Sequence, residues 1–216
     1  MRTWQDTATA EGGIEYLDVV DAHDRVLGRD TRANIHRNHL MHRGVHVLVV
    51  NSLGEILVQL RSPHLDTHPG YLDASAGGHV QSGETYRQAA GRELLEELGC
   101  HDSGLRHLLT YDGYSTRQLE KRALFLHHCD GPFRPDPAAV ADVEFHPPER
   151  LVRQFSRPCT EGFQRSVSYY FDHLAARSSQ VPAWRWGPHR SDASHSGDAP
   201  HNGGLPPPGA SLTKGV

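Results

Sequence analysis

The pattern of apolar and polar residues predicts a chain made mostly of short strands. Strands show apolar residues at alternate positions or in short runs, separated by Gly, Pro, Asn and Asp. These signals predict strands at 14–20, 25–28, 45–50, 55–60, 71–76, 105–114, 123–128 and 138–145. The run at 45–50 is apolar toward both faces, which is typical of a buried central strand. Polar turns at 21–24 and 51–54 are expected to join the first four strands into two hairpins.

Two segments have helical spacing instead. Residues 161–177 carry apolar side chains at Phe163, Val167, Tyr170, Phe171 and Leu174, which predicts a helix with one buried face. The second half of the stretch 77–100 also has helical spacing, with Thr85 and Gln88 as a capping box and Gly99 at the end. Ser82 is a competing cap. The expected fold class is α+β, a mixed sheet sandwiched between these two helices (α/β/α), with the helices on opposite faces.

The helix predicted in the second half of 77–100 carries acidic residues on one side. At about 100° per residue, Glu93, Glu96 and Glu97 fall within an arc of roughly 100° and are expected to face outward. The leucines occupy another sector and are expected to face a core: Leu94, Leu95 and Leu98. Like charges at this spacing repel each other, and a hard cation such as Mg²⁺ would turn the repulsion into attraction. The structural alternative is an ordinary acidic amphipathic helix.

The spacing of this segment identifies a family. Five residues separate Gly78 from Glu84, and seven more precede Arg92, which begins the run Arg-Glu-Leu-Leu-Glu-Glu-Leu-Gly-Cys. The segment Gly78–Cys100 resembles the Nudix box of Nudix hydrolases at every fixed position, with Cys100 where the family usually has an aliphatic residue. The N-terminal hairpin resembles that of the branch related to isopentenyl diphosphate isomerase. The resemblance implies the Nudix fold and cleavage of a diphosphate linkage in a nucleoside diphosphate derivative or related organic diphosphate.

The resemblance also implies a set of catalytic residues: Glu84, Arg92, Glu93, Glu96 and Glu97. The expected ligands of Mg²⁺, with Mn²⁺ as an alternative, are Glu93, Glu96, Glu97 and the carbonyl of Gly77. Arg92 is expected to orient Glu84 or a neighbouring glutamate through an ion pair. The glutamate that activates water lies outside the box in some family members. The candidates here are Glu120, in a predicted loop, and Glu144, in a predicted edge strand.

Three further residues are candidates for contact with substrate or a second metal. His42 and His79 resemble metal-binding histidines of the isomerase relatives, while His36 fits their spacing less well. Because the chain has 17 histidines, a purely structural role for the cluster near the first core strand is the alternative. Arg61 follows a predicted strand, where a cation would meet a phosphate or simply be solvated.

Two other functions compete with hydrolysis. The glycines at 77, 78 and 83 form the glycine loop before the helix. An isomerase of the isopentenyl diphosphate type would carry a catalytic cysteine directly before the Gly-His of this loop, where this chain has Gly77. Such isomerases also have a Glu-x-Glu that aligns with Glu120, and here Arg122 occupies the second position. A non-catalytic module that senses diphosphates is the other alternative, and the complete acidic set weighs against it.

Composition sets the remaining expectations. The chain has 216 residues, a net charge of −4 and 37% hydrophobic residues, which predicts a flexible leader at 1–13, one domain at 14–177 and a disordered tail at 178–216. The expected partner is a small-molecule diphosphate, with no nucleic acid and no membrane, and a homodimer is left open. Cys100, Cys129 and Cys159 are odd in number and lack the spacing of a metal site, so a reducing cytoplasm is the expected location.

Overall fold

The computed structural model describes residues 13–114, 118–151 and 157–177. The helices and strands follow in this order: β1 (Tyr16–Val20), β2 (Val26–Thr31), α1 (Arg32–Arg37), β3 (Met41–Val50), β4 (Ile56–Arg61), β5 (Leu72–Asp73), β6 (Ala76–His79), α2 (Tyr86–Leu98), β7 (Arg106–Tyr114), β8 (Leu119–His128), β9 (Val140–His146), α3 (Pro148–Leu151) and α4 (Glu161–Arg177). No helix in this part of the chain is long and apolar enough to cross a membrane.

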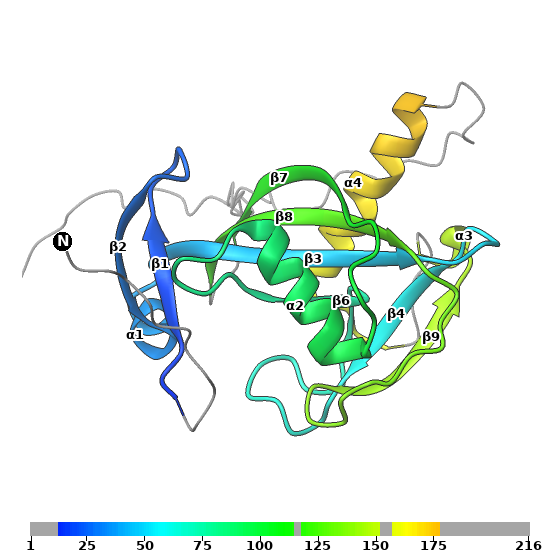
Figure 1. Cartoon of the computed structure of the whole chain (residues 1–216), viewed down its shortest axis with the longest axis horizontal. Coiled ribbons are helices and arrows are strands. Elements are labelled where there is room, and N and C mark those ends of the chain that lie inside the picture. The colour runs from blue at the N-terminus through cyan, green and yellow to red at the C-terminus, as the bar shows by residue number, and fades with distance from the viewer. Residues whose placement is uncertain (1–12, 115–117, 152–156, 178–216) are drawn as a thin grey trace, which may run out of the picture. The chain divides into compact units, whose positions relative to one another are not determined.

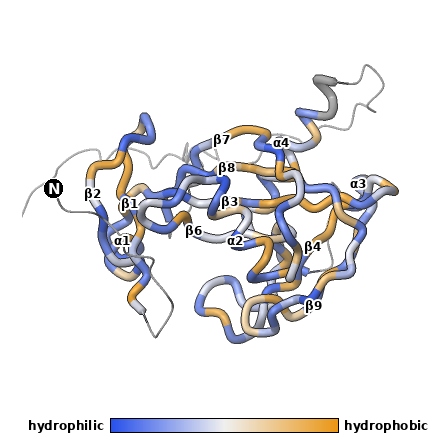
Figure 2. Tube along the Cα trace, viewed as in Figure 1, coloured by the Kyte–Doolittle hydropathy of each residue, from blue (hydrophilic) through white to orange (hydrophobic). Residues whose placement is uncertain are grey.

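Strand β3 is the centre of a mixed sheet (Figure 1). It pairs in parallel with β8 along its whole length and antiparallel with β6 through residues 44–47. β1 joins it at His42 and β4 joins it at Val50, while β2, β7 and β9 extend the sheet outward. Figure 2 shows hydrophobic residues along the C-terminal half of β3, as expected for a strand covered on both faces.

The two faces of β3 meet different helices. Val45, Val47 and Val49 point into a core that also contains apolar residues of α2: Ala89, Ala90, Leu94 and Leu98. His46 points to the opposite face, where its Nδ1 lies 2.8 Å from the Ser166 hydroxyl of α4. Because side chains alternate along a strand, α2 and α4 lie on opposite faces of the sheet, as the sequence predicts.

Local chemistry fixes the ends of α2. The Thr85 side chain accepts a hydrogen bond from the Gln88 amide, and the Gln88 side chain accepts one from the Thr85 amide, so the expected capping box is present. Ser82 does not cap the helix, because its hydroxyl donates to Asp18 at 2.6 Å. Gly99 ends the helix with a φ of 63°, a left-handed conformation that favours glycine.

Several boundaries differ from the prediction. β3 begins at Met41 and β8 at Leu119, so residues expected in loops lie on strands: His42, Glu120, Lys121 and Arg122. The predicted strand 71–76 is divided into β5 and β6. Ser75 interrupts it, because its hydroxyl donates to the Leu57 carbonyl at 2.5 Å and accepts from the Val49 amide at 2.8 Å. Helix α1 was not predicted.

The outward and inward sides of α2 also differ from the prediction. Glu97 is buried, with 9% of its surface exposed, whereas Leu95, expected in the core, is 44% exposed. The arc of acid therefore turns partly inward, toward the glycine loop, and only its outer edge meets solvent. The predicted leader up to residue 12 and the predicted tail from residue 178, with its two tryptophans Trp184 and Trp186, lie outside the described residues.

The glycine of β6 gives a test of this packing. A Cβ on Gly77 would lie 2.7 Å from Cδ2 of His46 and 2.8 Å from the Val45 carbonyl oxygen. Gly77→Ala should therefore lower the free energy of unfolding by about 1–3 kcal/mol, the cost typical of overpacking. Chemical denaturation measures this. Gly28→Ala is the control, since a Cβ there meets nothing within 4 Å, and an equal loss in both variants would contradict the argument.

Candidate active site

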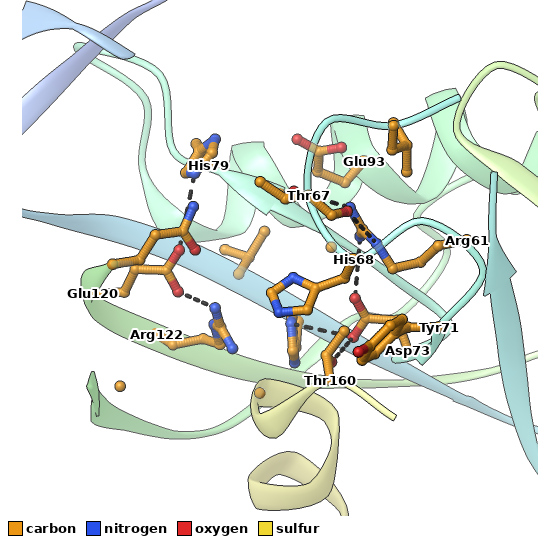
Figure 3. A pocket seen from close by; sticks show the side chains of 18 of the residues that line it. Arg61, Thr67, His68, Tyr71, Asp73, His79, Glu93, Glu120, Arg122 and Thr160 are labelled. Carbon is orange, nitrogen blue, oxygen red and sulfur yellow. Dashed lines mark hydrogen bonds and ion pairs between the residues drawn. The ribbon is translucent and has the colours of Figure 1, made fainter. Parts of the chain in front are cut away.

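A charged pocket of about 740 Å³ lies between the glycine loop, α2, β8 and the start of α4. Figure 3 shows His79, Glu120 and Arg122 at one end and Arg61, Asp73 and Thr160 at the other. Both acidic and basic side chains line this pocket. The acidic residues include Asp73, Glu93, Glu97 and Glu120, and the basic residues include Arg61, Arg122 and Arg165. A wall of this kind suits an anionic ligand together with cations that the carboxylates hold.

Arg92 is the most fully bonded side chain of α2. Its guanidinium donates to both carboxylate oxygens of Glu84, at 2.9 and 3.0 Å, and to the His79 carbonyl at 2.9 Å. It also donates to Glu93 at 2.8 Å and to Glu96 at 3.1 Å. Such a planar fork suits several fixed acceptors at once. Arg92 therefore holds the glycine loop against the helix and orients Glu93.

Glu97 and Glu93 lie directly against the glycine loop. One oxygen of Glu97 accepts hydrogen bonds from the Gly77 amide and from the Gln59 side chain, both at 3.0 Å. The carboxylate of Glu93 occupies the space that a side chain on Gly78 would need. The loop glycines thus allow two acidic groups to approach the backbone closely, which a larger residue would prevent.

Burial changes the protonation of both groups. It raises the pKa of Glu97 to about 8, and the neighbouring Glu93 charge adds to the effect. It also raises the pKa of Glu93 to about 7, although the Arg92 guanidinium acts in the opposite direction. A bound cation would favour the ionised forms instead, so this pair fits a metal that compensates for burial.

The other predicted acids take different positions. Glu84 is held by Arg92 and accepts a hydrogen bond from the Gln81 amide at 2.9 Å, contacts that brace the loop before α2. Glu96 has 58% of its side chain exposed and forms an ion pair with Arg92 at 3.1 Å. Glu144, 74% exposed and 3.6 Å from His146, does not line the pocket. It lies on the edge strand β9, paired with β4.

Three histidines meet beside the pocket. Nε2 of His36 lies 3.2 Å from Nε2 of His79, and the three ring centroids of His36, His42 and His79 lie 5.0–5.2 Å apart. One nitrogen from each ring lies within 4.8 Å of the others, a spacing that could hold a metal ion. Burial and the neighbouring imidazoles lower the pKa of His36 to about 4, which keeps the ring neutral and leaves one of its two nitrogens free to bind a metal.

Glu120 closes this histidine cluster. Its Oε1 lies 3.6 Å from Nε2 of His42 and 3.9 Å from Nε2 of His79. Nε2 of His42 is buried and has no hydrogen-bond partner among the described residues, so it is directed at this carboxylate and at the other rings. Burial favours the neutral acid, but Arg122 and the histidines outweigh it and hold the pKa of Glu120 well below its usual value.

The opposite end of the pocket is built around Asp73. Its carboxylate accepts from Arg61 at 3.1 Å and from the Thr160 hydroxyl at 2.7 Å. The Arg61 guanidinium also donates to the Thr67 carbonyl at 3.0 Å, so the loop after β4 fixes its direction. Arg61 is therefore a positioned cation at the pocket wall rather than a solvated strand end.

Sequence reasoning missed part of this site. Asp73, Thr160 and Arg165 were not singled out, because they come from segments far apart that carry no motif. Arg122 was noted only as a departure from an isomerase pattern. His36 belongs to the cluster although its spacing fitted less well, and the helix α1 that carries it explains the difference. The parallel pairing that places His42 opposite Glu120 was the missing signal.

Comparisons with known proteins agree with this architecture. A family model described as NUDIX domain matches residues 40–170. An uncharacterized Nudix hydrolase of Pseudomonas aeruginosa is 36% identical over 169 residues, covering 77% of this chain and 94% of that protein. Another, from Yersinia pestis, is 37% identical over 141 residues, covering 64% of this chain and 76% of that protein. The crystal structure of DR0079 from Deinococcus radiodurans has 28% identity and a TM-score of 0.63, covering 71% of this chain and 97% of that one.

The chain belongs to the Nudix family, and the α+β fold expected from its sequence is confirmed. It is a hydrolase that acts on diphosphate bonds, as the family and its relatives indicate. These comparisons do not specifically support the branch related to isopentenyl diphosphate isomerase. They name no substrate for this chain, which is consistent with substrate choice depending on loops outside the box.

The raised pKa of Glu97 leads to a pH-dependent stability in the absence of metal. Folding raises this pKa from 4.5 to about 8, so the stability that the protonated group contributes is full below about pH 4.5. It is lost as the pH rises through about 8. Relative to Glu97→Gln, metal-free wild type should therefore lose unfolding free energy between these limits, measured by urea denaturation with a chelator. A difference that stays constant with pH would contradict the burial argument.

Proposed function

We propose that this protein is a Mg²⁺-dependent hydrolase, with Mn²⁺ as a substitute, that cleaves the diphosphate linkage of a nucleoside diphosphate derivative or a related organic diphosphate. One observation carries the proposal. The two buried glutamates of α2, packed on the glycine loop, open into the same pocket as the cations Arg61 and Arg122. Metal-binding acids and phosphate-binding cations therefore face one space that is large enough for a small organic molecule.

Glu93, Glu96 and Glu97 would hold the metal together with the carbonyl of Gly77. Glu93 and Glu97 fit this role, because they are buried carboxylates whose pKa values are raised by burial, and a bound cation would favour their ionised forms. Glu96 is exposed at the rim and shares Arg92 with Glu93, so it is within the same acidic group. Bound Mg²⁺ supplies charge neutralisation on phosphoryl oxygens and lowers the pKa of a bound water.

The protein's own groups position the rest of the reaction. Arg92 keeps Glu93 in one orientation through its hydrogen bond at 2.8 Å and keeps the glycine loop in place through the His79 carbonyl. Arg61 and Arg122, on the other walls, would bind the phosphoryl oxygens and balance the charge of the leaving group. Together these contacts fix the substrate between the acids and the cations.

Glu120 is the better of the two proposed glutamates outside the box. It lines the pocket and stays ionised over the working pH range because its pKa is low. A low pKa makes a weak base, so Glu120 suits the orientation of water or the binding of a second cation. Together with His36, His42 and His79 it offers a nitrogen-rich set, which favours Mn²⁺ or another transition metal over Mg²⁺.

The isomerase alternative meets a steric obstacle. Catalysis of that type needs a cysteine at position 77, and a Cβ there would overlap His46 and the Val45 carbonyl. His46 cannot readily give way, because its ring is buried and bonded to Ser166. Those isomerases have a second acid at the position of Arg122. Here Arg122 forms an ion pair with Glu120, so this part of the pocket has one acid where they have two. Hydrolysis is the reaction that these residues favour.

Replacing Glu97 by Gln tests the metal site. The amide oxygen keeps the hydrogen bonds from Gly77 and Gln59 but removes the negative charge that a hard cation needs. We expect a loss of at least ~10²-fold in kcat, which corresponds to about 2.7 kcal/mol of transition-state stabilisation. Turnover of a diphosphate substrate and Mg²⁺ affinity measure it. Unchanged values for both would end the proposal, whereas a folding defect would appear as a lower Tm without metal.

A matched pair of variants separates the two glutamates outside the box. Glu120→Gln removes a charge inside the pocket, whereas Glu144→Gln removes one on the exposed edge strand β9. We expect kcat to fall by about 10-fold or more in the first variant, as when a group that positions water is lost. The second variant should behave as wild type. The reverse order of effects would assign the role to Glu144.

The substrate is found by direct screening. A panel of nucleotide sugars, dinucleotides, coenzyme A and isoprenoid diphosphates, incubated with Mg²⁺ or with Mn²⁺, would identify the class. The phosphomonoester products are converted to inorganic phosphate by an added phosphatase and measured. The same assay on a chain that ends at residue 177 tests our proposal that the domain at 14–177 carries the activity. Conversion of isopentenyl diphosphate into its isomer without phosphate release would support the alternative.

A further inference from the structure

Two cysteines and a histidine form a second cluster of metal-binding groups, apart from the residues that line the pocket. Sγ of Cys100 lies 3.6 Å from Sγ of Cys129 and 3.6 Å from Nε2 of His127. One ligand atom from each of the three residues lies within 4.8 Å of the other two. The cysteines lack the spacing of a metal site in the sequence, but folding brings this pair and a histidine together.

The fold brings the three residues together through two fixed segments. Gly99 turns the chain at the end of α2, so Cys100 points back into the core beside Leu98 and Leu105. His127 lies at the end of β8, opposite Val49 of β3, and the Cys129 amide donates to the Val50 carbonyl at 3.1 Å. The cluster is therefore preformed by backbone pairing and does not depend on an ion to gather its members.

The spacing matches that of ligands around a tetrahedral ion. With Zn–S bonds near 2.3 Å and Zn–N bonds near 2.0–2.1 Å, neighbouring ligand atoms lie about 3.6–3.8 Å apart. Both distances measured from Cys100 are 3.6 Å. Thiolates and imidazole are soft or borderline ligands that select zinc or copper(I) over Mg²⁺. We propose that Cys100, His127 and Cys129 form a binding site for a thiophilic cation, of which Zn²⁺ is the first to test.

The surroundings of the cluster support a ligand. His127 is 2% exposed, and its Nδ1 has no hydrogen-bond partner among the described residues. Its Nε2 faces Sγ of Cys100 at 3.6 Å, so this nitrogen is the one directed at the sulfurs. Burial raises the pKa of Cys100 to about 11, with Cys129 adding to the effect, so Cys100 is a thiol when no metal is bound. A cation would displace its proton. Cys129 is only partly buried, which leaves a route for the ion and room for water as a fourth ligand.

The site would connect the end of the box helix to the sheet. Cys100 follows α2 directly, whereas His127 and Cys129 belong to the end of β8 and the residue after it. An ion held by all three would close the segment between them and stabilise the folded chain through mass action. It would act on the helix that carries Glu93 and Glu97 from its far end, without touching the pocket.

Cobalt spectroscopy tests the site without relying on activity. Co²⁺ takes the ligands of Zn²⁺, and thiolate ligation gives a sulfur-to-cobalt charge-transfer band in the near ultraviolet that carboxylate and histidine sites do not give. We expect the reduced, chelator-treated full chain to show this band with one equivalent of Co²⁺. Added Zn²⁺ should abolish the band by displacing cobalt and should raise Tm.

Matched variants assign the band to these residues. Cys129→Ser, at a partly exposed position, and Cys100→Val should each remove it, while Cys159→Ser and His36→Gln should retain it because their side chains belong to other parts of the structure. Circular dichroism and the metal-free Tm show whether each variant folds. A wild-type protein without the band, a band that survives Cys129→Ser, or a Cys100–Cys129 disulfide that forms in place of metal uptake would overturn the proposal.

Discussion

The close contact between the glycine loop and the acidic face of α2 is the constraint on which the rest of the site depends. Glu93 fills the space beside Gly78, and Glu97 accepts a hydrogen bond from the Gly77 amide. Two carboxylates are thereby buried against backbone, at a cost that protons or cations must offset. Arg92 offsets part of it and binds the loop carbonyl in the same arrangement. The acidity of the site and the geometry of the loop are consequences of the same packing.

The division of charge inside the pocket follows from the sheet. Because β3 and β8 run parallel, residues at matching positions face the same side, and His42 lies opposite Glu120 while Gly44 lies opposite Arg122. The Glu120 carboxylate lies against Gly44, where a Cβ would make an ordinary van der Waals contact of 3.5 Å with its oxygen. The pairing of β3 with β8 therefore places the cation-binding group Glu120 and the anion-binding group Arg122 on the same side of the sheet.

Much of the fold could be predicted from the sequence, and the reasons are local. The capping box at Thr85, the left-handed Gly99 and the apolar run at 45–50 are signals that depend on near neighbours in the chain. The inward direction of Glu97 could not be predicted in this way, because a helix at 100° per residue does not show which side the glycine loop will cover. Likewise, Arg61 gains its partner Asp73 only when β4 and β5 pair. Contacts between distant segments decide what local patterns leave open.

The long parallel pairing of β3 with β8 also has a consequence for folding kinetics. Every residue of β3 pairs with a residue far along the chain, and the intervening segment contains β4, β5, β6, α2 and β7. Contacts of this kind must bear the entropy of closing a long loop before they give any stability, and they slow folding accordingly. The box helix can form early from its own caps, but Glu120 reaches the histidines only when the last of these contacts closes. During synthesis, the residues of the acidic helix therefore emerge before those of β8, which the complete pocket needs.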